Sequence, residues 1–418
     1  MSNNGKILVI GGGISGISAA ADAAEFGCDV VLVEKEPYLG GRVIRMNQYF
    51  PKLCPPACGM EINLRRIRQN PKITVHTLAE VEKISGETGD YTVTIRVGPR
   101  YVTGTKPVTQ AHFDAVTSEI PNAFNYDMDK TKALFLPHDG AFPPMYVLKK
   151  DALTSEESEK LKAAEPSGAI DLDMGEETIE EKVSAVIVAT GWRPYDVSKL
   201  DNLGGGKLAN VLTNVMMERL ASLNGPTEGK IVRPSDGKEP ATVAFAQCAG
   251  SRDENHLPYC SAVCCMASLK HARYVMEKLP EAKITIFYID IRAVGRFEHF
   301  YYELLDEENI SFVKGKVAKI TEDTATNNPV VEVEEVLGGG KISQPFDMVV
   351  LATGVVPSAA DSPIPGVSLS CDENGFLIDS PNGGGIFAAG CVKRPLDVSR
   401  SIKDSTAAVM KAIQVVRR

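Results

Sequence analysis

The stretch KILVIGGGISGISAAADAAEFGCDVVLVE, residues 6–34, decides the fold of the chain. Its largely apolar residues at 6–10 predict a buried strand that runs directly into the glycine-rich turn at 11–16. The alanine-rich segment that follows predicts a helix, and residues 29–33 predict a second buried strand. A strand, a glycine turn, a helix and a second strand with an acidic end together predict a Rossmann-type dinucleotide site.

Each polar or glycine position in this unit has a physical role. We expect Gly11 to permit the tight turn, Gly13 to let the backbone approach a pyrophosphate, and Gly16 to let helix and strand pack closely. The helix N-terminus offers free N–H groups to the phosphates. Glu34 stands where a carboxylate binds a ribose hydroxyl. The predicted cofactor-binding residues of this unit are Gly11, Gly13, Ile14, Ser15, Gly16, Glu34 and Lys35.

Later segments favour FAD over NAD. A Gly40-Gly41-Arg42 turn, two strands that each end in Ala-Thr-Gly (189–191 and 352–354), and the segment 385–390 resemble parts of thioredoxin reductase and glutathione reductase. In such flavoproteins an aspartate follows the last glycine, whereas this chain has Cys391. No covalent-flavin motif is evident, so we expect non-covalent FAD. The further predicted contacts are Gly41, Arg42, Val81, Ala189, Thr190, Gly191, Gly390 and Cys391.

A second Rossmann-like unit is predicted to start near residue 241, with strands at 242–246 and 283–289. The loop between them lacks the glycine turn of a pyridine-nucleotide site. It carries four cysteines instead, and we therefore expect that NAD(P)H does not bind there in the usual way. The four cysteines are Cys248, Cys260, Cys264 and Cys265.

Thiolates at this spacing can hold iron–sulfur clusters or zinc. Zinc sites usually use two short Cys-x-x-Cys pairs, and the adjacent Cys264 and Cys265 fit a zinc tetrahedron poorly. A cubane has irons spread over several ångströms, so adjacent cysteines can reach different irons. We therefore predict one 4Fe–4S cluster; zinc and buried structural thiols remain the alternatives.

Several rare motifs resemble the A subunit of heterodisulfide reductase. They are Cys-Ala-Gly-Ser-Arg-Asp (248–253), Pro-Tyr-Cys-Ser-Ala-Val-Cys-Cys-Met (258–266), Tyr-Ile-Asp-Ile-Arg (288–292), Arg-Tyr-Val (100–102) and Gly-Cys-Val (390–392). In that family the four-cysteine motif ligates a 4Fe–4S cluster next to FAD. Residues 103–170 contain no cysteine, so the ferredoxin-type inserts of the methanogen proteins are absent there. This short form most resembles the A subunit of the quinone-interacting membrane-bound oxidoreductase of sulfate reducers, with the corresponding proteins of sulfur oxidisers as the alternative.

The resemblance implies electron transfer between the menaquinone pool and a cytoplasmic partner such as adenylylsulfate reductase. It also implies two companions in the same complex: a membrane haem/iron–sulfur subunit, and with it a sister flavin/iron–sulfur subunit. We expect a cytoplasmic protein, peripheral on the inner face of the membrane and held there by these partners. An isolated chain is expected to be inactive.

Composition excludes several other classes. The net charge of −9 argues against nucleic-acid binding. No apolar run reaches the roughly 18–20 residues that span a bilayer, and no signal peptide precedes the strand at residue 6, so we expect a soluble chain without a membrane span. Nine cysteines, an odd number, argue for metal or redox chemistry over a disulfide framework.

Cys54 and Cys58 lie on a proline-rich turn that opens a predicted helix. Disulfide reductases of the glutathione reductase type carry their redox-active pair in this region, and a helix N-terminus favours thiolates. The pair is a candidate catalytic dithiol, and a stand-alone FAD-dependent disulfide reductase is therefore an alternative function. A structural turn or an extra cluster ligand are the other interpretations. The missing glycine loop at 247–253 weighs against a self-contained NAD(P)H-fed enzyme.

The predicted fold class is α/β, with two Rossmann-like dinucleotide-binding-type domains arranged as in thioredoxin reductase. The expected ranges are 1–200 for the first part of the FAD domain with an irregular insert at about 103–170, 201–239 for a linker, 240–344 for the cluster domain, and 345–418 for the second part of the FAD domain. His271, on the helix after Cys265, is expected on the helix surface rather than as a group that tunes the cluster.

Overall fold

The computed structural model describes residues 5–50, 52–360, 364, 369–379 and 384–417. Its first domain is built on a five-stranded parallel sheet in the order β24-β11-β1-β2-β3. The strands are β1 (Lys6–Ile10), β2 (Asp29–Glu34), β3 (Ile73–Thr77), β11 (Ala185–Val188) and β24 (Ile386–Ala388). The apolar run at 6–10 occupies the central strand, which is buried on both faces as a parallel strand requires.

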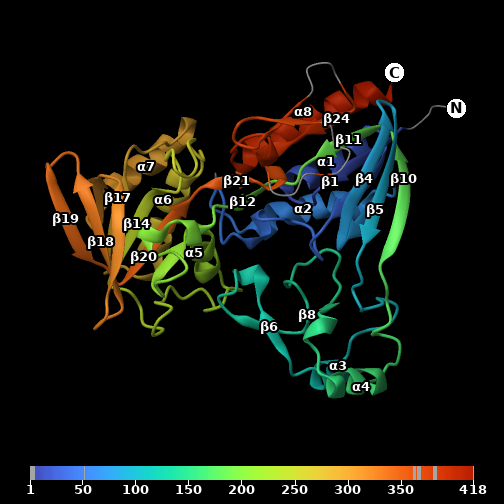
Figure 1. Cartoon of the computed structure of the whole chain (residues 1–418), viewed down its shortest axis with the longest axis horizontal. Coiled ribbons are helices and arrows are strands. Elements are labelled where there is room, and N and C mark those ends of the chain that lie inside the picture. Colours follow the sequence, from blue (N-terminus) through green and yellow to red (C-terminus); the bar gives the residue numbers. More distant parts are fainter. Residues whose placement is uncertain (1–4, 51, 361–363, 365–368, 380–383, 418) are drawn as a thin grey trace.

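Helices cover one face of this sheet and a small antiparallel sheet covers the other (Figure 1). The helices are α1 (Ile14–Glu25), α2 (Pro56–Gln69) and α8 (Val398–Val416), and the antiparallel strands are β4 (Ala79–Glu87), β5 (Asp90–Val97) and β10 (Glu177–Val183). Alternate residues of β1 serve the two cores, with Ile7 and Val9 facing the helices and Leu8 and Ile10 facing the antiparallel layer.

The second domain repeats this three-layer plan. Its parallel sheet has the order β13-β20-β14-β15-β16, with helices on one face and an antiparallel β17-β18-β19 sheet on the other. The strands are β13 (Val211–Thr213), β14 (Thr242–Ala249), β15 (Lys283–Tyr288), β16 (Ile310–Lys314), β17 (Val317–Asp323), β18 (Asn328–Glu335), β19 (Gly340–Pro345) and β20 (Met348–Thr353), and the helices are α5 (Asn214–Ala221), α6 (Cys264–Lys278) and α7 (Glu298–Leu305).

The second sheet extends beyond the expected 240–344 range at both ends. β13 and α5 fall inside the expected linker, and β20, assigned by sequence to the FAD domain, pairs with both β13 and β14. The chain crosses between the domains through β12 (Trp192–Pro194) and β21 (Val355–Pro357), which pair antiparallel. The misassignment has a simple cause: β11 and β20 are both apolar strands that end in Ala-Thr-Gly, and such a pattern does not say which sheet a strand joins.

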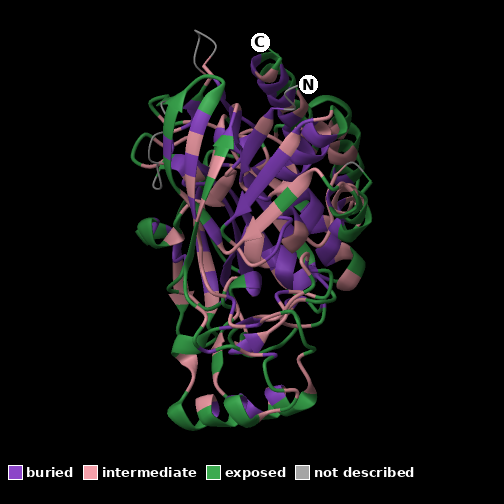
Figure 2. Cartoon of the chain, turned by 90° about the vertical axis from the view of Figure 1, so that its right-hand side faces the viewer, coloured by how far each residue is buried: buried purple, intermediate pink, exposed green. Residues whose placement is uncertain are grey.

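The insert between β5 and β10 projects from the first domain, and its far end with α3 and α4 is largely exposed (Figures 1 and 2). It is less irregular than expected, because it has its own small core around Val116, Leu134 and Leu161. Its elements are α3 (Gln110–Ala115), α4 (Ser155–Ala163), β6 (Glu119–Pro121), β7 (Lys130–Lys132), β8 (Leu134–Phe135) and β9 (Val147–Leu148). A further short hairpin pairs β22 (Ser370–Cys371) with β23 (Leu377–Ile378).

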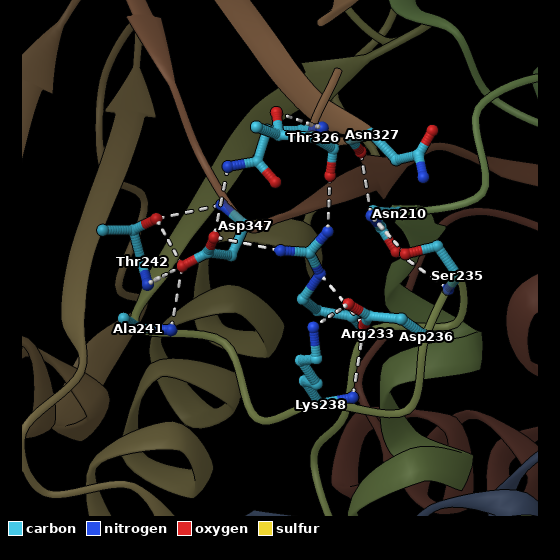
Figure 3. Close-up of polar contacts among 11 residues, drawn as sticks. Asn210, Arg233, Ser235, Asp236, Lys238, Ala241, Thr242, Thr326, Asn327 and Asp347 are labelled. Atoms are coloured by element: carbon cyan, nitrogen blue, oxygen red, sulfur yellow. Dashed lines mark hydrogen bonds and ion pairs between the residues drawn. The ribbon is translucent and has the colours of Figure 1, made fainter. Parts of the chain in front are cut away.

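A polar network fastens the amino ends of β14 and β20 (Figure 3). The Asp347 carboxylate accepts hydrogen bonds from the Ala241 and Thr242 N–H groups at 2.9 Å each and lies 3.3 Å from the Arg233 guanidinium. Arg233 also donates to the Thr326 carbonyl at 2.8 Å. Both ends of the 233–242 segment are thus bound to the second sheet.

Within the described residues, none of the helices combines the length and apolarity that crossing a membrane requires.

Candidate functional site

A cavity of about 320 Å³ opens at the carboxyl ends of the first sheet and extends to the second domain. Ligands of doubly wound sheets bind at this edge, since the loops that follow parallel strands gather there. The first domain contributes the β1–α1 turn, the end of β2, the 41–50 segment, residues 189–192 and the start of α8. The second domain contributes residues of α5, of α6 and of the short 3-10 helix Gly295–Phe297.

The glycine turn has the geometry that its sequence predicts. Gly11 has φ +104°, and a Cβ there would lie 2.5 Å from the Ala189 carbonyl oxygen. A Cβ on Gly16 would lie 1.7 Å from the Gly11 carbonyl oxygen, so helix and strand meet only through glycine. A Cβ on Gly13 would meet only Gly41, at 3.9 Å. Gly13 is the N-cap of α1 without a side-chain cap, which leaves the first-turn N–H groups available to a phosphate.

Glu34 ends β2 as expected and is almost fully buried. Its carboxylate accepts hydrogen bonds from the Gly12 N–H at 2.6 Å and the Glu36 N–H at 2.8 Å. Burial raises the pKa of this carboxyl group. Glu34 and Lys35 both line the cavity, so the carboxylate is held in place beside the glycine turn, where a ribose hydroxyl can donate to it.

The Gly-Gly-Arg turn and the first Ala-Thr-Gly segment form the next wall. Gly41 has φ +55°, and a Cβ on it would lie 2.8 Å from the Gly13 Cα, so the two turns pack backbone to backbone. Arg42 donates through Nε to the Trp192 carbonyl, and its guanidinium lies 5.1 Å from the Trp192 ring centroid. The Thr190 hydroxyl is buried in this wall and has no protein partner among the described residues. An orphaned hydroxyl beside a glycine cradle suits a polar cofactor such as FAD.

The last predicted segment closes the cavity at the start of α8. Gly390 has φ +74°, donates its N–H to Asp404 at 2.8 Å, and has no room for a Cβ beside Ser15. Cys391 lines the cavity, and its thiol donates to the Leu396 carbonyl at 3.3 Å. Burial raises the pKa of the Cys391 thiol. At this position the chain therefore presents a neutral thiol in place of the aspartate that the flavoprotein pattern predicts.

The structure describes all of the predicted cofactor residues, and three of them do not line the cavity. Gly16 and Gly390 act through close packing behind it. Val81 lies in β4 and packs against the core between the first sheet and the antiparallel layer. The other twelve predicted positions are Gly11, Gly13, Ile14, Ser15, Glu34, Lys35, Gly41, Arg42, Ala189, Thr190, Gly191 and Cys391, all of which line it.

The four cysteines of the second domain come together at the carboxyl end of its sheet. Cys248 lies near the end of β14 with φ +57°, and Cys264 and Cys265 are the first two residues of α6. Burial raises the pKa of Cys264 and raises that of Cys265 to about 11, and the charges of Cys248 and Cys260 add to both shifts. The Cys260 sulfur accepts the Ala262 N–H at 3.4 Å.

Among the residues described, no three Cys, His, Asp or Glu side chains are arranged around one point as a single metal ion requires. The four thiols influence one another electrostatically, and two arginine side chains lie beside them. Arg252 hydrogen-bonds toward Cys248 and Arg292 toward Cys260. Iron–sulfur clusters are anionic and are held by thiolates. Four cysteine sulfurs beside two guanidinium groups provide the ligands and the positive charge that such a cluster needs.

The cysteine loop adjoins the cavity directly. Ala262, Val263, Met266 and Ala267 line it, on either side of Cys264 and Cys265 in the sequence. A cluster on these cysteines would lie close behind this wall of the cofactor cavity.

A buried charge cluster that sequence reasoning missed lies in the cavity wall. One oxygen of Glu218, on α5, is 2.6 Å from Lys270 Nζ and 2.7 Å from His271 Nε2. His271 is fully buried, so the expectation of a helix-surface histidine is wrong. The signal was present in the sequence: Lys270 lies four residues after Met266 and four before Tyr274, on the apolar face of α6.

Cys54 and Cys58 lie outside the cavity wall. Cys58 is exposed in the first turn of α2, and Cys54 is half-buried just before it. Tyr49 connects the pair with the cavity, because Tyr49 lines the cavity and its N–H donates to the Cys54 carbonyl at 3.1 Å. The pair is therefore joined to the cofactor site through one aromatic residue.

These features define an FAD-binding flavoprotein fold with two nucleotide-type domains. A family model described as FAD dependent oxidoreductase matches residues 6–52. Thioredoxin reductase from Lactococcus lactis superposes with a TM-score of 0.53 at 14% identity over 99% of both chains. The enzyme from T. acidophilum gives 0.53 at 13% identity over 98% of this chain and 97% of the other. At such identity the likeness concerns the fold alone.

Sequence relatives are more specific. One of them, an iron–sulfur A subunit of the CoB–CoM heterodisulfide reductase of Methanopyrus kandleri, is 37% identical over 97% of this chain and 64% of its own length. The A subunit of the H2:CoB-CoM heterodisulfide,ferredoxin reductase of Methanothermobacter marburgensis is 34% identical over 99% of this chain and 64% of its own length. The chain is therefore similar over nearly its whole length to A subunits of heterodisulfide reductases, and it spans just under two thirds of the length of these relatives.

Proposed function

We propose that this chain is an electron-transfer subunit that holds FAD in the cavity and one 4Fe–4S cluster on Cys248, Cys260, Cys264 and Cys265. The observation that carries the proposal is the contact between the two sites: residues on both sides of Cys264 and Cys265 form part of the cavity wall. A flavin bound here supplies two-electron chemistry that can be divided into single electrons.

The chain's own residues would hold and isolate the cofactors. The first-turn N–H groups of α1 would bind the pyrophosphate, and Glu34 would accept from the ribose. Trp192 and Arg42 line one side of the cavity, and residues of α5 and α6 line the other. Arg252 and Arg292 would offset the charge of the thiolates.

The finer proposal places the chain in sulfate respiration. There it would move electrons between the menaquinone pool and a cytoplasmic acceptor such as adenylylsulfate reductase. Its partners would be a membrane haem/iron–sulfur subunit, which would hold it at the inner face of the membrane, and with it a sister flavin/iron–sulfur subunit. Support comes from the sequence resemblance, from the lack of cysteine in residues 103–170, and from relatives that are named as subunits of larger reductases.

The test is anaerobic purification of the chain from its native membranes after gentle detergent extraction. We expect acid-releasable FAD, about four iron atoms per chain, companion proteins that carry haem or clusters, and no bleaching of the flavin by NADH. A chain that runs alone without companions contradicts the complex. A heterodisulfide-reductase-like role in sulfur oxidation predicts companions without a haem-bearing membrane protein.

A second candidate is a stand-alone disulfide reductase that uses Cys54 and Cys58. The observation that favours it is the position of Cys58 in the first turn of α2, where the helix favours a thiolate, with Tyr49 between the pair and the cavity. Fast flavin reduction by NADPH, and loss of disulfide turnover in Cys58→Ser, would support this function over electron transfer in a complex.

A further inference from the structure

The charge cluster at the second-domain end of the cavity has one carboxylate at its centre. Glu218 Oε1 lies 2.6 Å from Lys270 Nζ and 2.7 Å from His271 Nε2. Glu218 Oε2 accepts the Asn47 N–H at 2.9 Å and the Tyr274 hydroxyl at 3.3 Å. Lys270 also donates to the Gln48 carbonyl at 2.5 Å. Glu218, Lys270 and His271 all line the cavity and are nearly or fully buried.

The negative charge of Glu218 is balanced by Lys270, so the cluster needs no charge on His271. The cations and donors around Glu218 hold the pKa of its carboxyl group well below the usual range, so it is an anion that can only accept. Lys270 supplies the matching cation. His271 therefore donates its Nε2–H to Glu218 as a neutral ring, and burial keeps the pKa of this imidazole low.

The other ring nitrogen of His271 has an unused lone pair. Nδ1 is buried and finds no hydrogen-bond partner within the described part of the chain. The ring is fixed between Tyr274, with centroids 5.6 Å apart, and Phe245 on β14, at 6.4 Å. A histidine with a purely structural role normally has both nitrogens paired. This one has a free basic atom in the wall of a cofactor cavity.

We propose that His271 is a proton-accepting positioning residue, which takes up one proton at Nδ1 when negative charge develops in the cavity. The inference rests on the proposed FAD site. Two electrons and one proton added to a flavin leave one net negative charge. The second proton, drawn from solvent, would reside on His271, and Glu218 would stabilise the resulting imidazolium through the existing 2.7 Å contact.

The groups that face His271 are consistent with this behaviour. Within the described residues, Glu218 on α5 is the anion that contacts it and favours protonation, whereas Lys270 on α6 and burial oppose it. Tyr274 and the Phe245 ring are neutral, and the 47–48 segment contributes backbone groups to Glu218 and Lys270. The balance keeps the ring neutral until one further negative charge arrives.

The experiment counts protons rather than turnover. In His271→Gln the new side chain keeps an amide N–H for Glu218 but has no basic atom. The matched control is His299→Gln, which makes the same change at an exposed histidine. The FAD midpoint potential of the anaerobic protein is titrated between pH 6 and 8. We expect a slope of two protons per two electrons in the wild type and in the control, and of one proton per two electrons in His271→Gln.

Proton uptake on reduction, followed with an indicator dye in weak buffer, is the second measurement, and it needs only the wild type. One proton per two electrons in the wild type, or equal slopes in wild type and His271→Gln, overturns the inference. Failure to bind FAD at all would instead contradict the proposed function, so the two failures are distinguishable.

Discussion

The two sheets of the molecule share one plan and differ at one loop. Each has a central strand (β1 or β14), two further strands on one side, and a strand leading into Ala-Thr-Gly on the other. In the first domain three residues join the central strand to α1, and they form the glycine turn. In the second domain residues 250–263 join β14 to α6; Cys260 lies in this loop, and Cys248, Cys264 and Cys265 lie at its two ends. The same scaffold thus places a loop at the edge of each sheet, and the residues of the two loops give them different chemistry.

Gly16→Ala is the change expected to have the largest effect, because a side chain at this position of α1 would collide with the first of the two loops. The added Cβ would lie 1.7 Å from the Gly11 carbonyl oxygen, and backbone cannot move aside cheaply. We expect loss of FAD and more than about 4 kcal/mol of stability. Acid-released FAD and the free energy of unfolding in urea measure both. Gly175→Ala, where a Cβ meets nothing within 4 Å, is the control; bound FAD in Gly16→Ala would refute the prediction.

Cys264→Ala removes a thiol where the second loop meets α6 and leaves the first loop intact. We expect iron to fall from about four atoms per chain to none while FAD is retained, because the glycine turn and Glu34, the predicted FAD contacts, lie on the first domain. Iron counted anaerobically and the flavin spectrum are the measurements. Cys371→Ala, at an exposed cysteine far along the chain, serves as the control. Full iron content in Cys264→Ala would rule out this residue as a ligand.

Glu218→Gln tests the region where the two loops meet. It leaves Lys270 without its buried counter-ion, so we expect a loss of about 3 kcal/mol. The lowered pKa of Glu218 means that its stabilisation is present above the ordinary glutamate pKa of about 4.3 and is lost as the pH falls below it. Urea unfolding from pH 7 to 3 is the measurement. Equal pH slopes for variant and wild type would contradict the lowered pKa.

Asp347→Asn tests the opposite end of the second sheet, away from the two loops. It has the smallest expected effect. Asp347 binds two N–H groups and Arg233 at the amino ends of the strands, away from both loops (Figure 3). An amide retains part of these bonds, so we expect a loss of about 1–2 kcal/mol with FAD and iron unchanged. Thermal unfolding and cofactor counts decide this. Cofactor loss would show that the two ends of the sheet are coupled.

Local patterns were sufficient to predict which residues of the first domain gather around one cavity. The strand, turn and helix of residues 6–34 lie as predicted, and twelve of the predicted contacts line one cavity. The clustering of the four cysteines was also foreseeable, since three of them lie within six residues of one another. The domain boundaries were not, because β11 and β20 have the same pattern and belong to different sheets.

The sequence by itself determined the dinucleotide fold and the cysteine loop, because each depends on neighbours in the chain whose spacing is set by backbone geometry. Only the tertiary structure decided that Glu218 meets His271, 53 residues away, and the Asn47 backbone, 171 residues away. Such contacts depend on how two domains pack across β12 and β21. A charged residue on an amphipathic helix is placed by that packing, and its partners cannot be read from its own segment.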